Sequence, residues 1–244
     1  MKILGVVFDK DGTLIDLPSF WFGPVSHTID ILQAEYGFGK KTAKELLIAS
    51  GMRPDGSGIP EGLVMSGTNL DITKAWKLIL QEQGITLKDD FVETSRYMLA
   101  SNAEHGTLQG MTDLSPLLSE LRSRDLKIGI VTSDDYEQTR YSMEELGVLE
   151  FFDTIIGADL VENPKPAADS MEAIVSAWGI PKESILMVGD SVNDMKFAAQ
   201  SGVAGVYFHE EEMVIPEGAS YDITDLNEVI EVLDQIENET TDFS

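Results

Sequence analysis

The sequence predicts an α/β fold in which a parallel-sheet core is interrupted by an inserted helical segment. Short apolar runs that end in Gly, Asp or Thr recur along the chain, and helical patterns separate the later runs. Strands that alternate with helices in this way form parallel sheets wound on both faces. After the first run, no comparable strand pattern appears for roughly ninety residues, and this gap predicts the insertion.

Five segments have the pattern of buried strands, and four helical patterns accompany them in the core. The predicted strands are residues 3–8, 127–131, 154–156, 185–188 and 205–208, and the predicted core helices are residues 114–124, 136–146, 167–178 and 192–200. The carboxyl ends of parallel strands meet at one edge of the sheet, where open α/β folds bind their ligands. The loops that follow the strands are therefore the place to look for chemistry.

The inserted segment, residues 15–107, is predicted to be a helical cap domain. Its helical patterns cover residues 25–36, 41–49, 72–83 and 90–102, and a Gly- and Pro-rich loop at residues 50–62 interrupts them. The core domain is then discontinuous and consists of residues 1–14 and 108–244. The acidic end of the chain after Glu237 is expected to be a frayed tail.

The composition excludes several classes of function. The 244 residues include 17 basic and 43 acidic side chains, and a net charge of -26 repels nucleic acid and anionic membrane surfaces. There is no cysteine, so neither a disulfide framework nor a thiolate site is available. The N-terminus resembles a buried strand more than a signal peptide, and no apolar stretch reaches the roughly 18 residues of a membrane span. We expect a cytoplasmic enzyme, monomeric or homodimeric, with a small-molecule partner.

The negative charge is unevenly distributed between the two predicted domains. Residues 15–107 carry 8 basic and 12 acidic side chains, whereas the remainder carries 9 basic and 31 acidic ones. An anionic substrate therefore needs local cations in the core, and any further anion-binding group is best sought in the cap.

Polar residues that a strand-to-helix loop does not require follow several predicted strands. Each alone is more often a helix cap or turn residue. Together they place four carboxylates, one ammonium and one hydroxyl at a single edge of the sheet. Such crowding of carboxylates needs a cation, and ligands that are all oxygen favour Mg²⁺. The residues are Asp9, Asp11, Thr132, Lys165, Asp190 and Asp194.

The same residues carry a resemblance to a known family. The segments FDKDGTL at residues 8–14, IVTS at 130–133, the Lys of NPKP at 163–166 and GDSVND at 189–194 resemble, in order, the four motifs of the haloacid dehalogenase (HAD) superfamily of phosphohydrolases. The resemblance implies a Rossmann-like core with a helical (C1-type) cap inserted after the first motif, as in phosphoglycolate phosphatase-like members.

The resemblance also implies a role for each motif residue. Asp9 would be the nucleophile that forms an aspartyl-phosphate, and Asp11 the acid and base. Thr132, with Ser133 beside it, would bind the phosphoryl oxygens, and Lys165 would neutralise the charge of nucleophile and phosphate.

Mg²⁺ would be held by three of the aspartates, and the resemblance implies how. Asp190 would bind the ion together with Asp9 and the backbone carbonyl of Asp11, while Asp194 would support its water shell.

Elementary chemistry agrees with these roles. A carboxylate attacks phosphorus only if the repulsion between anions is cancelled, which Mg²⁺ and Lys165 would do for Asp9. The leaving alkoxide needs a proton, and the water that attacks the phosphoenzyme must lose one, so Asp11 serves both steps. Gly12, directly after Asp11, permits the tight approach and turn that this role needs.

Two residues of the cap are candidates for substrate recognition. Trp21 begins the cap soon after the nucleophile and could line the mouth of the site, although packing inside the cap would explain it equally well. Arg53, beside the Gly- and Pro-rich loop, could meet a substrate carboxylate or a second phosphate, but an exposed loop charge is the simpler explanation.

The sequence favours a Mg²⁺-dependent phosphatase of a small phosphomonoester, with phosphoglycolate as the leading substrate. Sugar phosphates, nucleotides and pyrophosphate are alternatives. A β-phosphoglucomutase-like enzyme is a further alternative, although Trp21 occupies the position of that family's cap His. Haloacid dehalogenases and phosphonatases usually lack the second aspartate, so Asp11 argues against both.

Two alternatives lie outside enzymes of this kind. A signalling receiver module also combines clustered acids with Thr and Lys, but its chain is about half as long and its acceptor Asp ends an internal strand. A catalytically inactive binding protein is the other alternative, and turnover of a generic phosphomonoester would exclude it.

Overall fold

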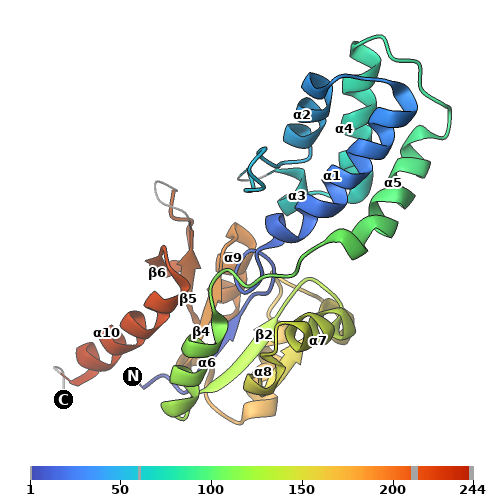
Figure 1. Cartoon of the computed structure of the whole chain (residues 1–244). Helices are drawn as coiled ribbons and strands as arrows, with labels where there is room; N and C mark the ends of the chain where they lie inside the picture. The colour runs from blue at the N-terminus through green and yellow to red at the C-terminus, as the bar shows by residue number, and fades with distance from the viewer. Residues whose placement is uncertain (1, 60–61, 210–213, 242–244) are drawn as a thin grey trace. The chain divides into compact units, whose positions relative to one another are not determined.

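The computed structural model describes residues 2–59, 62–209 and 214–241, and the chain forms two compact units. One unit consists of Met1–Ile15 and Gly110–Ser244, and the other of Asp16–Gln109 (Figure 1). We call them the core and the cap and describe each by itself. No helix in the described part of the chain is long and apolar enough to cross a membrane.

The core is built on a six-stranded sheet whose paired strands all run parallel. Its spatial order is β3-β2-β1-β4-β5-β6, so the first strand lies between β2 and β4 and chain order reverses there. A reversal of this kind opens a crevice at the carboxyl ends of the two central strands. The strands are β1 (Gly5–Phe8), β2 (Lys127–Val131), β3 (Thr154–Ile156), β4 (Ile185–Gly189), β5 (Ala204–Phe208) and β6 (Ala219–Ile223).

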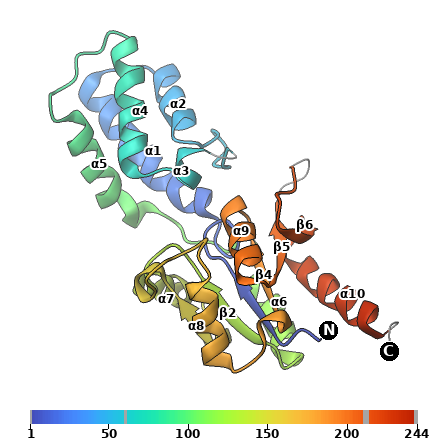
Figure 2. The ribbon, with the colours of Figure 1, turned by 180° about the vertical axis from the view of Figure 1, so that it is seen from behind.

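Helices cover both faces of this sheet. Side chains of α8 and α9 pack with Val7, Val131 and Met187 in one apolar cluster, and α6 lies on the opposite face (Figures 1 and 2). Since both faces are covered, β1 and β4 are buried along their whole length, as parallel strands require. The core helices are α6 (Leu114–Ser123), α7 (Tyr136–Glu145), α8 (Asp169–Trp178), α9 (Val192–Ser201) and α10 (Val229–Thr241).

The cap is helical, and its apolar cluster is separate from that of the sheet. Trp76 lies at its centre with no exposed surface, and its indole N–H donates to the Leu46 carbonyl at 3.0 Å and to Ser50 Oγ at 2.9 Å. The cap helices are α1 (Leu17–Tyr36), α2 (Lys40–Ala49), α3 (Leu63–Ser66), α4 (Asn69–Glu82) and α5 (Phe91–Ser101). Short 3₁₀ turns occur in both units. In the cap, η1 covers Asn102–His105; in the core, η2 to η5 cover Leu149–Phe151, Ala158–Leu160, Lys182–Ser184 and Leu226–Glu228.

The predicted parallel α/β fold is confirmed, and every predicted strand and helix is present, but the end of the chain differs. The tail predicted to fray after Glu237 belongs to α10, which ends at Thr241; residues 242–244 lie outside the described residues. The helix forms because Val229, Val232, Leu233 and Ile236 repeat at helical spacing and are buried.

Two further elements and one helix start were not predicted. Among the strands that the structure describes, β6 pairs only with β5, and it is partly exposed, so it lacks the continuous apolar run of a central strand. Helix α1 begins at Leu17, eight residues before the predicted start at residue 25, because Asp16 caps it by accepting from the Ser19 N–H at 3.1 Å. The short α3 lies beside residues 60–61 of the predicted loop, which are outside the described residues.

Candidate active site

Three aspartates meet at the carboxyl edge of the central strands. Asp9 follows β1, Asp190 follows β4, and Asp194 lies in the first turn of α9. The Asp9 N–H donates to the Val188 carbonyl at 2.8 Å, which joins the ends of β1 and β4. One carboxylate oxygen of each aspartate lies within 4.8 Å of the other two. The sheet thus gathers residues that are 185 positions apart in the chain.

Lys165 supplies the positive charge of this cluster. Its Nζ lies 2.5 Å from Asp9 Oδ1 and 2.7 Å from Asp194 Oδ1, and its side chain is 3% exposed. Burial alone would lower the pKa of Lys165, but the charges of Asp9 and Asp194 outweigh it and raise this pKa above its ordinary value. Lys165 therefore stays an ammonium at neutral pH and holds two carboxylates together.

Helix α9 fixes the position of Asp194 through a capping box. Asp194 Oδ2 accepts from the backbone N–H of Ser191 at 3.1 Å and from its Oγ at 2.5 Å, while the Asp194 N–H donates back to that Oγ. Both carboxylate oxygens of Asp194 are thus engaged, one by the helix cap and one by Lys165. The Asp194 carboxylate is therefore less available for direct metal binding than the carboxylates of Asp9 and Asp190.

The first loop makes room for Asp190. Thr13 Oγ1 donates to Asp190 Oδ1 at 3.1 Å. Gly12 has a φ of 84°, and a Cβ there would lie 2.2 Å from Asp190 Oδ2, so a side chain at this position would displace the carboxylate. Burial, with the nearby charge of Asp194, raises the pKa of Asp190 to about 7.

The acidic cluster fits a hard divalent cation. Burial raises the pKa of Asp9 well above its usual range, the charge of Lys165 opposes this rise, and the charges of Asp194 and Asp190 add to it. One lysine does not balance three carboxylates, and all the donors are oxygen, which Mg²⁺ prefers. One carboxylate oxygen of each aspartate lies within 4.8 Å of the others, so the cluster is close enough together to hold one cation.

Asp11 has different surroundings from Asp9, although only one residue separates them. Its Oδ2 lies 3.0 Å from Lys10 Nζ, which also lies 2.7 Å from Asp134 Oδ2. Burial raises the pKa of Asp11, and the charge of Lys10 opposes that rise. The side chain of Asp11 is not part of the acidic cluster, and its neighbours Lys10 and Asp134 are not among the site residues predicted from the sequence. The available signal was a lysine placed between two aspartates directly after a buried strand.

Thr132 and Ser133 lie in the loop that follows β2. Thr132 is buried, and its Oγ1 accepts from the Asp134 N–H at 3.1 Å, which tightens the loop. Ser133 is exposed. Because β2 is the neighbour of β1, both residues lie at the same edge of the sheet as Asp9.

Trp21 and Arg53 belong to the cap, and the structure places each within that unit. Trp21 is half-buried, packs against the apolar cluster of the cap, and meets Phe20 edge to face at 5.4 Å between ring centroids. Arg53 is exposed, and its guanidinium donates to Ser57 Oγ at 3.2 Å and to the Gly58 carbonyl, which closes its own loop. Their role in substrate recognition stays a prediction.

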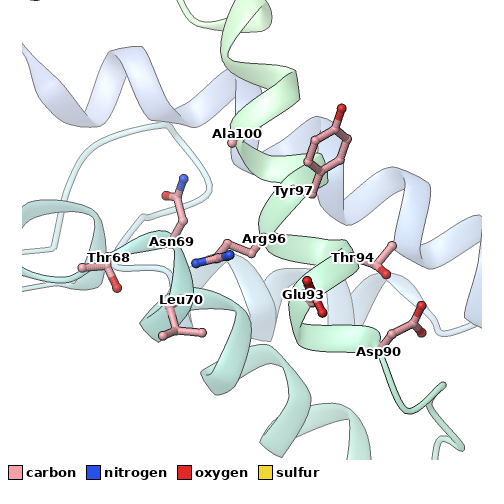
Figure 3. A pocket seen from close by; sticks show the side chains of 9 residues that line it. All are labelled: Thr68, Asn69, Leu70, Asp90, Glu93, Thr94, Arg96, Tyr97 and Ala100. Atoms are coloured by element: carbon pink, nitrogen blue, oxygen red, sulfur yellow. The ribbon is translucent and has the colours of Figure 1, made fainter.

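The cap also has an open groove of about 860 Å³ between the first turn of α4 and the exposed side of α5. Figure 3 shows Arg96 reaching from α5 toward the first turn of α4. The residues that line it are Thr68, Asn69, Leu70, Asp90, Glu93, Thr94, Arg96, Tyr97 and Ala100, and no predicted site residue is among them.

An open parallel sheet with an acidic cluster and a buried lysine at its carboxyl edge is the arrangement of a haloacid dehalogenase-like hydrolase. The model of the family with that description matches residues 6–207, and the chain belongs to this family. It is therefore an enzyme of the hydrolase class.

Individual relatives share about a quarter of their residues with this chain. It is 28% identical to pyrophosphatase PpaX of Halalkalibacterium halodurans over 204 residues, which cover 83% of this chain and 82% of the relative. It is 27% identical to phosphoglycolate phosphatase of Caulobacter vibrioides, with 88% of this chain and 84% of the relative covered. Among solved structures, the HAD phosphatase of Thermococcus onnurineus is 26% identical, with a TM-score of 0.61 and coverage of 96% and 98%.

Proposed function

We propose that the protein is a Mg²⁺-dependent phosphatase that hydrolyses a small phosphomonoester through a phosphorylated Asp9. The observation that carries the proposal is the position of the Asp9 carboxylate. It lies at the carboxyl edge of the sheet, with Lys165 on one oxygen and two further aspartates beside it. An anionic nucleophile can approach an anionic phosphoryl group only where positive charge offsets their repulsion, and Lys165 with a bound cation would provide that charge.

Asp9 is the nucleophile in this proposal. Since Lys165 holds its Oδ1, Oδ2 is the oxygen that attacks phosphorus. The new Asp9–phosphorus bond forms as the bond from phosphorus to the alcohol oxygen breaks. Thr132 and Ser133 bind the phosphoryl oxygens from the neighbouring strand end, and the ammonium of Lys165 offsets their charge.

Asp11 transfers the protons. It gives its proton to the departing alcohol oxygen in the first step, and as a carboxylate it takes a proton from the water that cleaves the Asp9–phosphorus bond. Its side chain lies outside the acidic cluster that would hold the Mg²⁺, so Asp11 Oδ1 is left to exchange a proton while Oδ2 pairs with Lys10.

Asp9, Asp190 and the backbone carbonyl of Asp11 would hold the Mg²⁺, and Asp194 would orient its water shell. When bound, the cation supplies positive charge that offsets the repulsion between the carboxylates and the phosphoryl group. Thr13 and Ser191 keep the carboxylates of Asp190 and Asp194 in place through the hydrogen bonds described above.

The substrate we propose is a small phosphomonoester such as phosphoglycolate. The name of the Caulobacter relative supports phosphoglycolate, and that of the Halalkalibacterium relative supports pyrophosphate, so both belong in a substrate panel. Sugar phosphates and nucleotides complete it. A cytoplasmic location and a monomeric or homodimeric state stay predictions.

The test is release of phosphate from p-nitrophenyl phosphate with Mg²⁺, after exhaustive chelation, and by an Asp9→Asn variant. We expect release only with a hard divalent cation, and background activity in the variant with an unchanged circular dichroism spectrum. Undiminished turnover after chelation would remove the cation from the proposal. Wild-type turnover by Asp9→Asn would show that Asp9 is not the nucleophile.

A further inference from the structure

A buried lysine that takes no part in the proposed phosphoryl transfer links two loops of the core. The Lys10 side chain is 4% exposed, and its ammonium contacts the Oδ2 atoms of Asp11 and Asp134 at 3.0 Å and 2.7 Å. A buried ammonium is stable only where charged partners accept its hydrogen bonds. Lys10 therefore remains with these two carboxylates and connects the loop after β1 to the loop after β2.

Asp134 is the fixed end of this link. Its backbone N–H donates to Thr132 Oγ1 at 3.1 Å, and its carbonyl accepts from the Ala158 N–H at 2.9 Å. A Cβ on the neighbouring Gly157 would lie 2.8 Å from that same carbonyl, so the backbone here is closely packed. The Asp134 carboxylate can thus anchor the lysine although its own side chain is 46% exposed.

Asp11 is the end that needs to be held. Its side chain is 27% exposed, and the ion pair with Lys10 engages Oδ2, which leaves Oδ1 to exchange a proton. Proton transfer requires hydrogen-bond reach, and a carboxylate without a fixed partner spreads over several rotamers. We propose that Lys10 is a positioning residue for Asp11, which it holds through Asp134 in the orientation that proton transfer requires. This inference rests on the acid and base role in the proposed function.

The test compares two esters of similar shape, phenyl phosphate and p-nitrophenyl phosphate, by kcat/KM. This ratio covers only the steps up to release of the phenol, so later hydrolysis of the phosphoenzyme does not affect it. Phenolate is the poorer leaving group and depends more on a proton from Asp11. Lys10→Met keeps a long apolar stem without the ammonium. We expect it to lower kcat/KM about tenfold more for phenyl phosphate than for p-nitrophenyl phosphate.

Asp134 offers a second pair of variants if Lys10→Met does not fold. Asp134→Ala removes the anchor and should show the same selective loss, whereas Asp134→Asn keeps an oxygen that accepts from Lys10 and should retain the wild-type ratio between esters.

Lys127→Met is the matched control. Lys127 begins β2, at the amino edge of the sheet, and its ammonium pairs with Asp153 at 2.9 Å. The variant therefore also removes a lysine–aspartate ion pair from the core, but one far from Asp11. Its ester ratio should equal that of the wild type. Equal losses for both esters, or no loss, in folded Lys10→Met or Asp134→Ala would overturn the inference. If the wild type cleaves neither ester, the proposed function fails, which is a distinct outcome.

Discussion

The two aspartates of the first loop differ in their neighbours, and this difference separates their proposed roles. Asp9 shares Lys165 with Asp194, whereas Asp11 pairs with Lys10. A carboxylate held among other carboxylates suits attack on phosphorus once a cation is present. A carboxylate outside that cluster keeps an oxygen for proton transfer.

Asp11→Asn should separate the two proton transfers. With p-nitrophenyl phosphate the leaving group needs little acid help, so the first step should proceed, while the water attack lacks its base. Phosphorylated Asp9 should then accumulate, visible as a burst near one equivalent of p-nitrophenolate and as added phosphate mass on the Asp9 peptide. Steady turnover at the wild-type rate without a burst would show that Asp11 is not the base.

An alkyl phosphate is the control for this experiment. Its alkoxide needs a proton in the first step, so Asp11→Asn should be slow throughout and show little phosphoenzyme. A burst with both esters would mean that Asp11 acts only as the base.

The gathering of Asp9, Asp190 and Asp194 could be predicted from sequence because parallel strands end at a common edge. The link from Lys10 to Asp134 could not, since it depends on how two loops turn after their strands and not on where the strands end. The alternation of β1 ends where this loop begins, so strand periodicity no longer predicts where the Lys10 side chain points.

At the scale of elements, sequence patterns located the buried strands and the long helices, and failed where the signal was weak or interrupted. Pro24 lies inside α1, and because proline usually ends or begins a helix, the residues before it were not predicted to be helical. The N-cap residue Asp16 was the sequence signal for the earlier start. Strand β6 alternates partly exposed and exposed residues up to a buried Ile223, which resembles a loop until its pairing with β5 is known.

Trp76→Phe should destabilise the cap by about 1–3 kcal/mol, because the variant loses both indole hydrogen bonds within a buried cluster. Hydrogen exchange measured by mass spectrometry should show faster exchange in peptides of α2 and α4. Trp178→Phe, which loses a bond to Thr154 Oγ1 in the core, is the control and should leave those cap peptides unchanged. Unaltered exchange in α2 and α4 of Trp76→Phe would contradict this account of the cap.

Changes at Arg53 or Trp21 should alter the ranking of substrates more than the chemistry with p-nitrophenyl phosphate. The reason is that recognition of the leaving group, if the cap performs it, is separable from phosphoryl transfer in the core. The measurement is kcat/KM across phosphoglycolate, pyrophosphate and sugar phosphates for Arg53→Ala and Trp21→Ala. Arg53→Lys, which keeps the charge, is the matched control, and equal losses for every substrate would count against a role in specificity.

At the scale of the whole molecule, the net charge of -26 concentrates in the unit that holds the acidic cluster. Folding of the core brings three carboxylates together against their mutual repulsion, with Lys165 as their charged partner. The stability of the chain without metal should therefore depend on whether those carboxylates are protonated.

The melting temperature of the metal-free protein should fall by several degrees between pH 5 and pH 8. The pKa of Asp190 is about 7 in the folded chain, against about 3.9 when unfolded. Between these values the folded state binds more protons than the unfolded state, so its stability decreases as pH rises. The raised pKa of Asp9 acts in the same direction.

Added Mg²⁺ should reverse this loss, and do so more at pH 8 than at pH 5, because a cation binds the ionised carboxylates and stabilises the folded state by mass action. Asp190→Asn should flatten the pH dependence and weaken the response to Mg²⁺. Asp153→Asn is the control, because Asp153 lies outside the acidic cluster and the pKa of its carboxyl is lowered, not raised, in the folded chain. Scanning calorimetry gives the dependence of the melting temperature on pH, once with EDTA and once with Mg²⁺. A melting temperature that is constant from pH 5 to pH 8 without metal, or a slope that survives in Asp190→Asn, would show that the acidic cluster does not set the pH dependence of the fold.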